Sequence, residues 1–252
     1  MAELGRVKRI LKRIYGDREG EALERIMPLI ERFSVKKSDK EGYFSQEDVV
    51  LITYGDSLLG EGQVPLVTLH DFASTYLKDA ISTVHFLPFF PWSSDDGFSV
   101  MDFFTINPEL GSWEEVVAIG SDFQLMFDYV VNHFSSKGQW FENYLAGKEG
   151  HVDFAMEVDP ATDLSQVTRP RALPLLSEYK KNDGSTVHLW TTFSADQIDF
   201  NFRSLDVLEK MIEVLLFYVQ QGATILRLDA IAYLWKEIGT NCIHLNQTHD
   251  MV

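Results

Sequence analysis

The stretch that decides the fold is Ala223-Thr224-Ile225-Leu226-Arg227-Leu228-Asp229-Ala230. It begins as an apolar run typical of a buried strand and ends with an arginine and a carboxylate. Alternate side chains of an extended strand share a face, so Ile225, Arg227 and Asp229 are expected to point to one side. An arginine and an aspartate on one face of a strand indicate that this face opens on a polar pocket.

In such a pocket Arg227 would keep the carboxylate of Asp229 ionised, because a nearby opposite charge favours the charged form. An ionised carboxylate fixed at the end of a strand is what a covalent sugar-transferring enzyme uses as its nucleophile. The plainer interpretation is a buried Arg–Asp pair that only ties two strands together, and these two residues alone favour it. The rest of the chain changes that balance.

Further segments show the same kind of buried strand, and helical periods lie between them. The apolar runs cover 49–54, 81–88 and 123–133, and the helical periods cover 66–80, 113–120 and 205–220. Near-continuous apolar strands that alternate with helices indicate an α/β fold with a parallel sheet buried on both faces. Four such βα units are half of a TIM-type (β/α)8 barrel. An open doubly wound sheet is the alternative, and the long insertion after the third strand favours the barrel.

The sequence predicts four parts. Residues 1–45 form an N-terminal helical extension that breaks at Gly16-Asp17 and ends in a polar linker over 36–42. Residues 46–133 hold barrel strands one to three, and 134–203 form an inserted subdomain, because so long a structureless loop is uncommon in a compact domain. Residues 204–252 hold the third barrel helix and the fourth strand, which leaves the barrel incomplete.

Composition limits the partners. The 252 residues are 45% hydrophobic and 24% charged, with a formal net charge of −16. So acidic a chain argues against nucleic acid and against an anionic membrane surface. Cys242 is the single cysteine, so no disulfide forms within the chain. The N-terminus lacks a signal peptide's apolar core, and we expect a cytoplasmic enzyme.

Polar and aromatic residues follow the second and third predicted strands. His133 ends the run over 123–133, where active-site groups of parallel barrels are built. The loop after 81–88 holds an aromatic cluster beside Asp95-Asp96-Gly97-Phe98. Aromatic faces stack on sugar rings and aspartates accept hydrogen bonds from vicinal hydroxyls, so this loop is interpreted as a sugar-binding loop rather than an aromatic surface loop.

Together these motifs resemble a known family. Asp128…Asn132-His133 with Arg227-Leu228-Asp229-Ala230 is similar to the first two sequence signatures of glycoside hydrolase family thirteen, the α-amylase clan. Segments similar to its sucrose phosphorylase subfamily lie at 51–56, 86–91, 94–98, 110–113 and 169–171. The N-terminal extension and the segments 90–94, 191–199 and 234–237 resemble the glucosylglycerate phosphorylase branch.

The resemblance implies a retaining double displacement in which Asp229 is the catalytic nucleophile. Arg227 would hold that nucleophile charged, and His133 would contact the 6-hydroxyl region of glucose. The remaining implied substrate-binding residues are Asp95 and Phe98 for glucose, Tyr233 beside the intermediate, and Arg171 for phosphate or an anionic acceptor such as glycerate. For Arg171, packing within the insertion is an equally weighted interpretation.

The implied activity is transfer of glucose from glucosylglycerate, or from sucrose, to inorganic phosphate, which gives α-glucose 1-phosphate. No cofactor is implied, and no metal, although Asn132 matches a position that holds calcium in many amylases. The family's acid/base glutamate and third acid would follow Val252, so this chain alone is expected to be inactive. An α-glucoside hydrolase of the same clan and a non-catalytic carbohydrate-binding fragment stay open as alternatives, as does the oligomeric state.

Overall fold

The computed structural model describes residues 2–33 and 44–252, and the polar linker expected over 36–42 lies outside them. The chain divides into two compact units. Unit 1 comprises Met1–Arg32, Val130–Glu213 and Asp229–Val252, and unit 2 comprises Phe33–Tyr129 and Val214–Leu228. Each unit is described by itself below.

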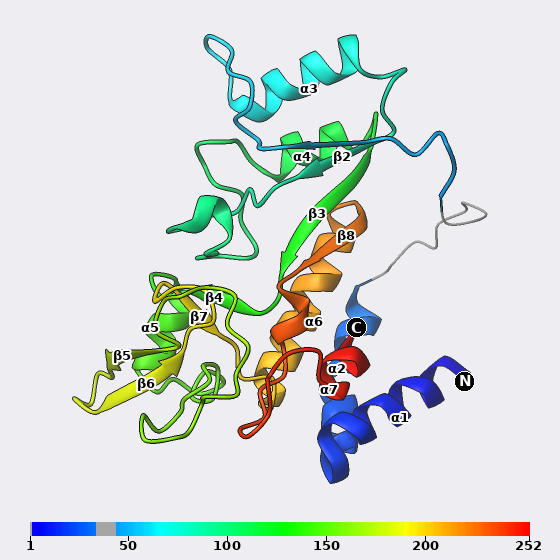
Figure 1. The fold of residues 1–252 in the computed structure, drawn as a ribbon. Coiled ribbons are helices and arrows are strands. Elements are labelled where there is room, and N and C mark those ends of the chain that lie inside the picture. Colours follow the sequence, from blue (N-terminus) through cyan, green and yellow to red (C-terminus); the bar gives the residue numbers. More distant parts are fainter. Residues whose placement is uncertain (1, 34–43) are drawn as a thin grey trace. The chain divides into compact units, whose positions relative to one another are not determined.

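The centre of unit 2 is a four-stranded sheet (Figure 1). Its strands are β1 (Val50–Thr53), β2 (Thr83–Phe86), β3 (Gln124–Val130) and β8 (Ala223–Asp229), in the order β1-β2-β3-β8. The pairs β1·β2 and β2·β3 are parallel. Neighbours in the sheet follow the order of the chain without the reversal that marks a doubly wound sheet, so the topology is that of consecutive barrel strands.

Helices separate these strands, as the sequence predicts. Helix α3 (Pro65–Tyr76) precedes β2, α4 (Trp113–Ile119) precedes β3, and α6 (Leu205–Gln220) precedes β8. Helix α4 begins with a capping box: the Ser112 hydroxyl accepts from the backbone N–H of Glu114, and the Glu115 carboxylate accepts from the backbone N–H of Ser112 at 2.7 Å. These bonds satisfy donors that a helix start leaves open, which fixes where the helix begins.

The core of unit 2 is aromatic. Phe127 of β3 packs edge-on against Phe89, with ring centroids 5.0 Å apart. Tyr218 of α6 stacks on Phe90 with centroids 5.0 Å apart and planes 9° apart. The ring centroids of Trp113 in α4 and Phe89 are 5.8 Å apart. Large buried rings supply much of the apolar burial, so this cluster holds the loop after β2 against the sheet and its helices.

The insertion in unit 1 is built from two short antiparallel sheets and a helix. Strand β4 (His133–Ser135) pairs with β7 (Gln197–Asp199), and β5 (Leu176–Lys180) pairs with β6 (Thr186–Trp190). Helix α5 (Gln139–Leu145) follows β4. The predicted single strand over 123–133 is therefore wrong at its end, because β3 stops at Val130 and His133 opens β4. The sequence from Val130 to His133 holds no glycine or proline that would mark a break, so the pattern carries no sign of this change of partner.

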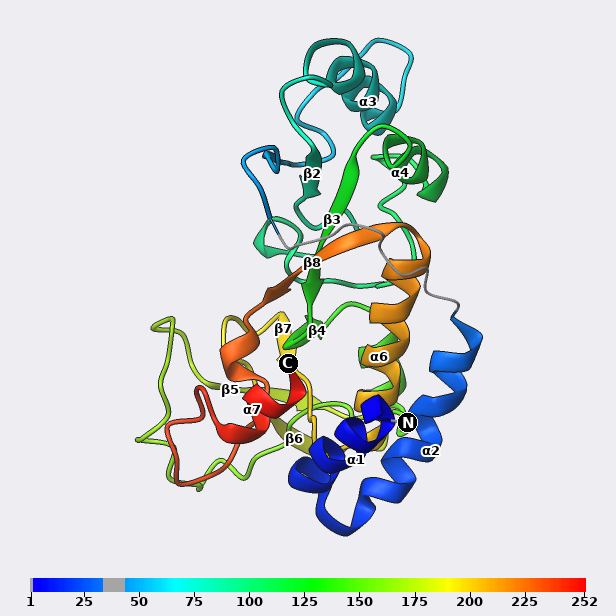
Figure 2. The same cartoon turned by 90° about the vertical axis from the view of Figure 1, so that its right-hand side faces the viewer.

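The remaining helices of unit 1 lie at the two ends of the chain. Helices α1 (Ala2–Tyr15) and α2 (Glu19–Arg32) flank a 3-10 turn, η1 (Gly16–Arg18), at the predicted break. Leu11, Ala22 and Ile26 pack on Leu205 at the start of α6, and Figure 2 shows α1 and α2 beside that helix. Arg13 of α1 hydrogen-bonds Asp250 of α7 (Asn246–Met251) at 2.8 Å. Within the described residues, no helix combines the length and the apolar character that a bilayer crossing requires.

Candidate functional site

The loop after β2 in unit 2 holds a strained turn. Asp95, Asp96 and Gly97 form a 3-10 turn, η2, in which all three have positive φ, at 57°, 50° and 102°. A Cβ on Gly97 would lie 2.8 Å from the backbone oxygen of Pro88. Only glycine therefore fits there, as the sequence predicts for a sharp turn. Strained backbone of this kind gathers at functional sites, and here it presents the half-buried Asp95.

Arg227 of β8 lies against residues of the neighbouring strand and of this loop. Its guanidinium donates to Oδ1 of Asp128 in β3, and its Cζ lies 5.5 Å from the centre of the Phe98 ring. Asp128 is completely buried, and its other oxygen, Oδ2, lies 2.9 Å from Nε2 of His85. The structure thus brings together two predicted site residues, Arg227 and Phe98. It also gives Arg227 an ionic partner that the sequence did not assign.

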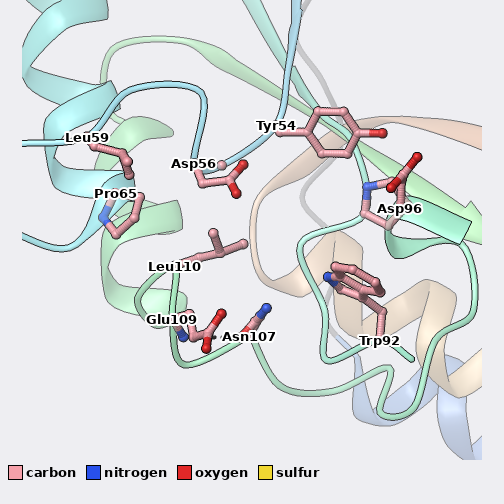
Figure 3. A pocket seen from close by; sticks show the side chains of 11 residues that line it. Tyr54, Asp56, Leu59, Pro65, Trp92, Asp96, Asn107, Glu109 and Leu110 are labelled. Carbon is pink, nitrogen blue, oxygen red and sulfur yellow. Dashed lines mark hydrogen bonds between the residues drawn. The ribbon is translucent and has the colours of Figure 1, made fainter. Parts of the chain in front are cut away.

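Unit 2 also contains a cavity of about 600 Å³ beside this loop. In Figure 3, Asp96 and Trp92 lie on one side of it, Leu59 and Pro65 on the other, and the Tyr54 ring extends toward Asp96. Burial raises the pKa of the Tyr54 hydroxyl, and nearby carboxylates add to the rise. The lining joins an aromatic face with polar groups, which suits a polyhydroxyl ligand. Trp92 belongs to the aromatic loop predicted to bind sugar, whereas the sequence assigned Tyr54 to no site.

In unit 1 a half-buried phenylalanine, Phe193, gathers three of the predicted site residues. Its ring centroid lies 5.2 Å from that of His133 and 5.6 Å from that of Tyr233, and the Cζ of Arg171 lies 5.7 Å from it. In the sequence, Phe193 stands out only as part of the segment 191–199, which resembles the family. Its position shows that it is the centre of this cluster, in which an aromatic face, an imidazole and a guanidinium come together.

His133 is buried, and the groups around it fix its imidazole. Nε2 of Gln197 lies 3.2 Å from Nε2 of His133. The carbonyl oxygen of the same Gln197 side chain accepts from the Ser194 hydroxyl at 2.9 Å. Because an amide nitrogen only donates, Nε2 of His133 accepts in this pair. The amide nitrogen of Asn132 lies 3.4 Å from the other ring nitrogen, Nδ1. Gln197 is a second residue of this cluster that the sequence did not single out.

Asp229 is the last residue of β8 and is half-buried. The strand is unbroken from Ala223 to Asp229, so alternation assigns Arg227 and Asp229 to one face, as predicted. The next residue, Ala230, has a φ of 51° and starts the 3-10 turn η3 (Ile231–Tyr233), in which the N–H of Tyr233 donates to the oxygen of Ala230. The chain thus turns sharply just after the candidate nucleophile, and this turn brings Tyr233 to Phe193.

The same region contains Asn132, which the resemblance relates to a calcium position. Across residues 2–33 and 44–252, no group of three or more His, Cys, Asp or Glu side chains is arranged to hold a metal ion. Asn132 donates from its amide to Asp199 at 2.9 Å instead. The side-chain oxygen of Asn132 accepts from a lysine ammonium at 3.0 Å.

Comparison with known proteins defines the class. Residues 74–250 match the family model of the α-amylase catalytic domain, and the chain belongs to this family. This match, with the order of the strands, confirms the predicted barrel-type fold. A solved structure of sucrose 6F-phosphate phosphorylase from Thermoanaerobacter thermosaccharolyticum is similar, with a TM-score of 0.75 and 31% identity over 83% of this chain and 45% of that one.

Two curated relatives are more similar in sequence. The chain is 48% identical to the glucosylglycerate phosphorylase of Spirochaeta thermophila, which it matches over 100% of its own length and 44% of that protein. It is 52% identical to the glucosylglycerate phosphorylase of Escherichia coli, over 83% of this chain and 38% of that protein. The predicted resemblance to this branch is confirmed. The chain spans less than half the length of the relatives that it matches.

Proposed function

We propose that this chain carries the glucosyl-accepting part of an α-glucoside phosphorylase, which moves glucose from glucosylglycerate, or from sucrose, to inorganic phosphate. The observation that carries the proposal is the position of Asp229 at the end of β8, in a chain whose relatives of highest identity named above are glucosylglycerate phosphorylases. The end of a parallel barrel strand is where this architecture places its reacting groups.

In the proposed first step, Asp229 attacks the anomeric carbon of the α-glucoside. A bond forms between the carboxylate oxygen and that carbon, and the bond to the leaving oxygen breaks, which gives a β-glucosyl ester. In the second step a phosphate oxygen attacks the same carbon and the Asp229 carboxylate leaves, which gives α-glucose 1-phosphate. Two inversions retain the α configuration.

The binding roles follow from the two clusters. In unit 2, Asp95 would accept hydrogen bonds from glucose hydroxyls, and Phe98 would offer an aromatic face under the Arg227 guanidinium. In unit 1, the Phe193 cluster would contact the glucosyl group through His133 and Tyr233. Arg171 is exposed beside Phe193, and its planar guanidinium suits phosphate or a glycerate carboxylate.

The first step can be tested on this chain with α-glucosyl fluoride. Fluoride leaves without a proton donor, so the reaction does not need an acid/base glutamate. We expect a mass increase of one glucosyl residue, located on Asp229 by peptide mapping. The Asp229→Asn variant is the control and should stay unlabelled. No label on the parent chain, or label on another residue, would overturn the assignment of the nucleophile.

The second step separates phosphorylase from hydrolase. Phosphate is already an anion and needs no general base to attack the ester, whereas water does. We expect added phosphate to release α-glucose 1-phosphate and restore the unlabelled mass much faster than buffer alone. Equal release of free glucose without phosphate would favour the hydrolase. Binding of glucosides without any label would favour a carbohydrate-binding fragment.

A further inference from the structure

A lysine ammonium is enclosed in the middle of unit 1. The side chain of Lys236 is 2% exposed, and its Nζ lies 2.7 Å from Oδ2 of Asp199, whose side chain is 0% exposed. The same Nζ donates to the side-chain oxygen of Asn132 at 3.0 Å. Burying two charges costs several kcal/mol per ion unless good geometry and further hydrogen bonds offset it.

Further hydrogen bonds surround the carboxylate of Asp199. It accepts from the amide of Asn132 at 2.9 Å, from the backbone N–H of Thr192 at 2.8 Å and from the Thr192 hydroxyl at 2.6 Å. With the ammonium, four donors reach this one side chain. Lys236, Asp199, Asn132 and Thr192 are named the buried quartet below.

Each member of the buried quartet lies close in sequence to a candidate glucosyl-binding residue. Asn132 directly precedes His133, and Thr192 directly precedes Phe193. Lys236 lies three positions after Tyr233, which is the last residue of η3. Asp199 is in β7 with Gln197, whose amide donates to His133. The quartet therefore ties together the segments that carry His133, Phe193 and Tyr233.

Fold stability does not by itself account for this arrangement. Apolar residues of similar volume often replace a buried ion pair with no loss of stability, because the pair pays for its own desolvation. Apolar residues do not supply directional contacts. An ammonium bound to two oxygens fixes the distance between the two segments that carry those oxygens. Burial lowers the pKa of Lys236, and the carboxylate of Asp199 opposes that shift. Burial of the Lys236 ammonium therefore costs free energy, which the ion pair with Asp199 offsets.

We propose that Lys236 is a positioning residue: its ammonium, bound to Asp199 and Asn132, sets the spacing of His133, Phe193 and Tyr233 around the glucosyl group. The role in sugar chemistry rests on the proposed function, whereas the effect on the geometry of the cluster does not. Lys236 itself contacts neither sugar nor phosphate in this assignment and acts only through the segments that it joins.

The test is a variant with a neutral pair, Lys236→Met with Asp199→Asn. The asparagine keeps an acceptor oxygen for the backbone N–H of Thr192. Its amide nitrogen can donate to the Thr192 hydroxyl and, once the Asn132 amide turns, to the side-chain oxygen that the ammonium no longer holds. We therefore expect a urea midpoint near that of the parent chain. We expect the imidazole resonances of His133 to shift in NMR spectra. The maximal rate of labelling by α-glucosyl fluoride should fall about tenfold to a hundredfold, with a smaller change in the half-saturating concentration, because misplaced groups lose rate more than affinity.

The matched control is Lys181→Met. Lys181 lies in the same unit and pairs with Glu157 at 2.5 Å, but its side chain is 22% exposed and it is not a member of the quartet. We expect this variant to keep the parent labelling rate and the parent His133 resonances. Should the methionine variant fail to fold, Lys236→Gln with Asp199→Asn keeps an amide donor toward Asn132 and enters the same three measurements.

The outcomes are separable. Unchanged His133 resonances and an unchanged labelling rate in the neutral-pair variant would overturn the positioning role. A fall in rate that merely parallels a fall in stability would also overturn it. If the parent chain takes no label, the proposed function fails, and the His133 resonances alone then decide whether Lys236 sets the geometry of the cluster.

Discussion

Nε2 of His85 lies 2.9 Å from Oδ2 of Asp128, and both side chains are buried in adjacent strands of the parallel sheet. The other oxygen of Asp128 accepts from Arg227 of β8. One carboxylate thus joins β2, β3 and β8 at the end of the sheet from which the Asp95 loop departs. The aspartate that opens the first family signature is a structural centre of unit 2.

The first prediction concerns this carboxylate. Asp128→Asn removes the charge that holds Arg227, and we expect a loss of about 2 kcal/mol in the free energy of unfolding, measured by urea denaturation. The loss is below that of a fully enclosed pair because the Arg227 side chain is 41% exposed. Asp122→Asn, at a partly exposed carboxylate of the same unit, should cost less at neutral pH because solvent screens its ion pairs. Equal losses would contradict the central role of Asp128.

The second prediction concerns the strained turn. Gly97→Ala places a Cβ 2.8 Å from the backbone oxygen of Pro88 at a φ of 102°. Gly62→Ala is the control, since Gly62 has a φ of 75° and open space around its Cβ position. We expect the Gly62 change to cost about 1 kcal/mol for the left-handed backbone. The Gly97 change should cost at least about 1 kcal/mol more for the overlap. Equal urea midpoints for the two variants would contradict this prediction, because they would show that the loop shifts to accommodate the added methyl group.

The third prediction is a pH dependence. Lys78, His70 and Ser74 hold the pKa of the Asp122 carboxyl far below its usual 3.8. A carboxyl whose pKa is lowered in the folded state contributes stability that is fully present above 3.8 and is lost as the pH falls through the folded value. The stability difference between the parent chain and Asp122→Asn should therefore shrink on acidification below 3.8. A constant difference in urea midpoints across that range would refute the linkage.

The fourth prediction addresses Phe193. Phe193→Leu keeps an apolar side chain but removes the flat ring that meets His133, Tyr233 and Arg171. We expect glucoside affinity, measured by isothermal titration calorimetry, to fall by up to about tenfold, the value of an aromatic contact beyond its area. Tyr76→Leu, at an aromatic residue that is 71% exposed, should leave the affinity unchanged. Unchanged binding in the Phe193 variant would remove this ring from the site.

The fifth prediction tests Arg171. Arg171→Lys keeps the charge and removes the planar fork that can grip two phosphate oxygens. In the glucosyl-labelled chain, we expect the phosphate concentration for half-maximal release of α-glucose 1-phosphate to rise several-fold. Arg169→Lys changes an exposed arginine two positions away and is the charge-matched control. The same rise in both variants would assign the effect to the whole segment and not to Arg171.

Much of the parallel sheet could be predicted from the sequence because its central strands, β2 and β3, are largely buried. The expected burial on both faces is wrong for β1, which lies at one edge of the sheet and whose Val50 and Ile52 are 42% and 61% exposed. The runs predicted over 49–54, 81–88 and 223–229 are mostly apolar and bounded by turns, and the structure places a strand within each of them. The end of β3 could not be predicted. Val131, Asn132 and His133 continue the run, and only pairing with β7, distant in sequence, shows that His133 opens another strand.

The candidate site was predictable where one short segment carries the chemistry. Arg227 and Asp229 in one strand, and Asp95 with Phe98 in one turn, are visible as motifs. Phe193, Gln197 and Lys236 were not, because each takes its meaning from partners far along the chain. An aromatic residue in the insertion, an amide and a lysine after a turn have no local pattern that separates them from ordinary packing or surface residues.

The buried quartet also constrains the order of events during synthesis. Lys236 leaves the ribosome 104 residues after Asn132, with which it shares a hydrogen bond. Domains generally fold as units while the chain emerges. Here the insertion is complete in sequence before Lys236 has been made, so the ion pair between Lys236 and Asp199 cannot yet form. This ion pair can therefore form only after translation has passed β8.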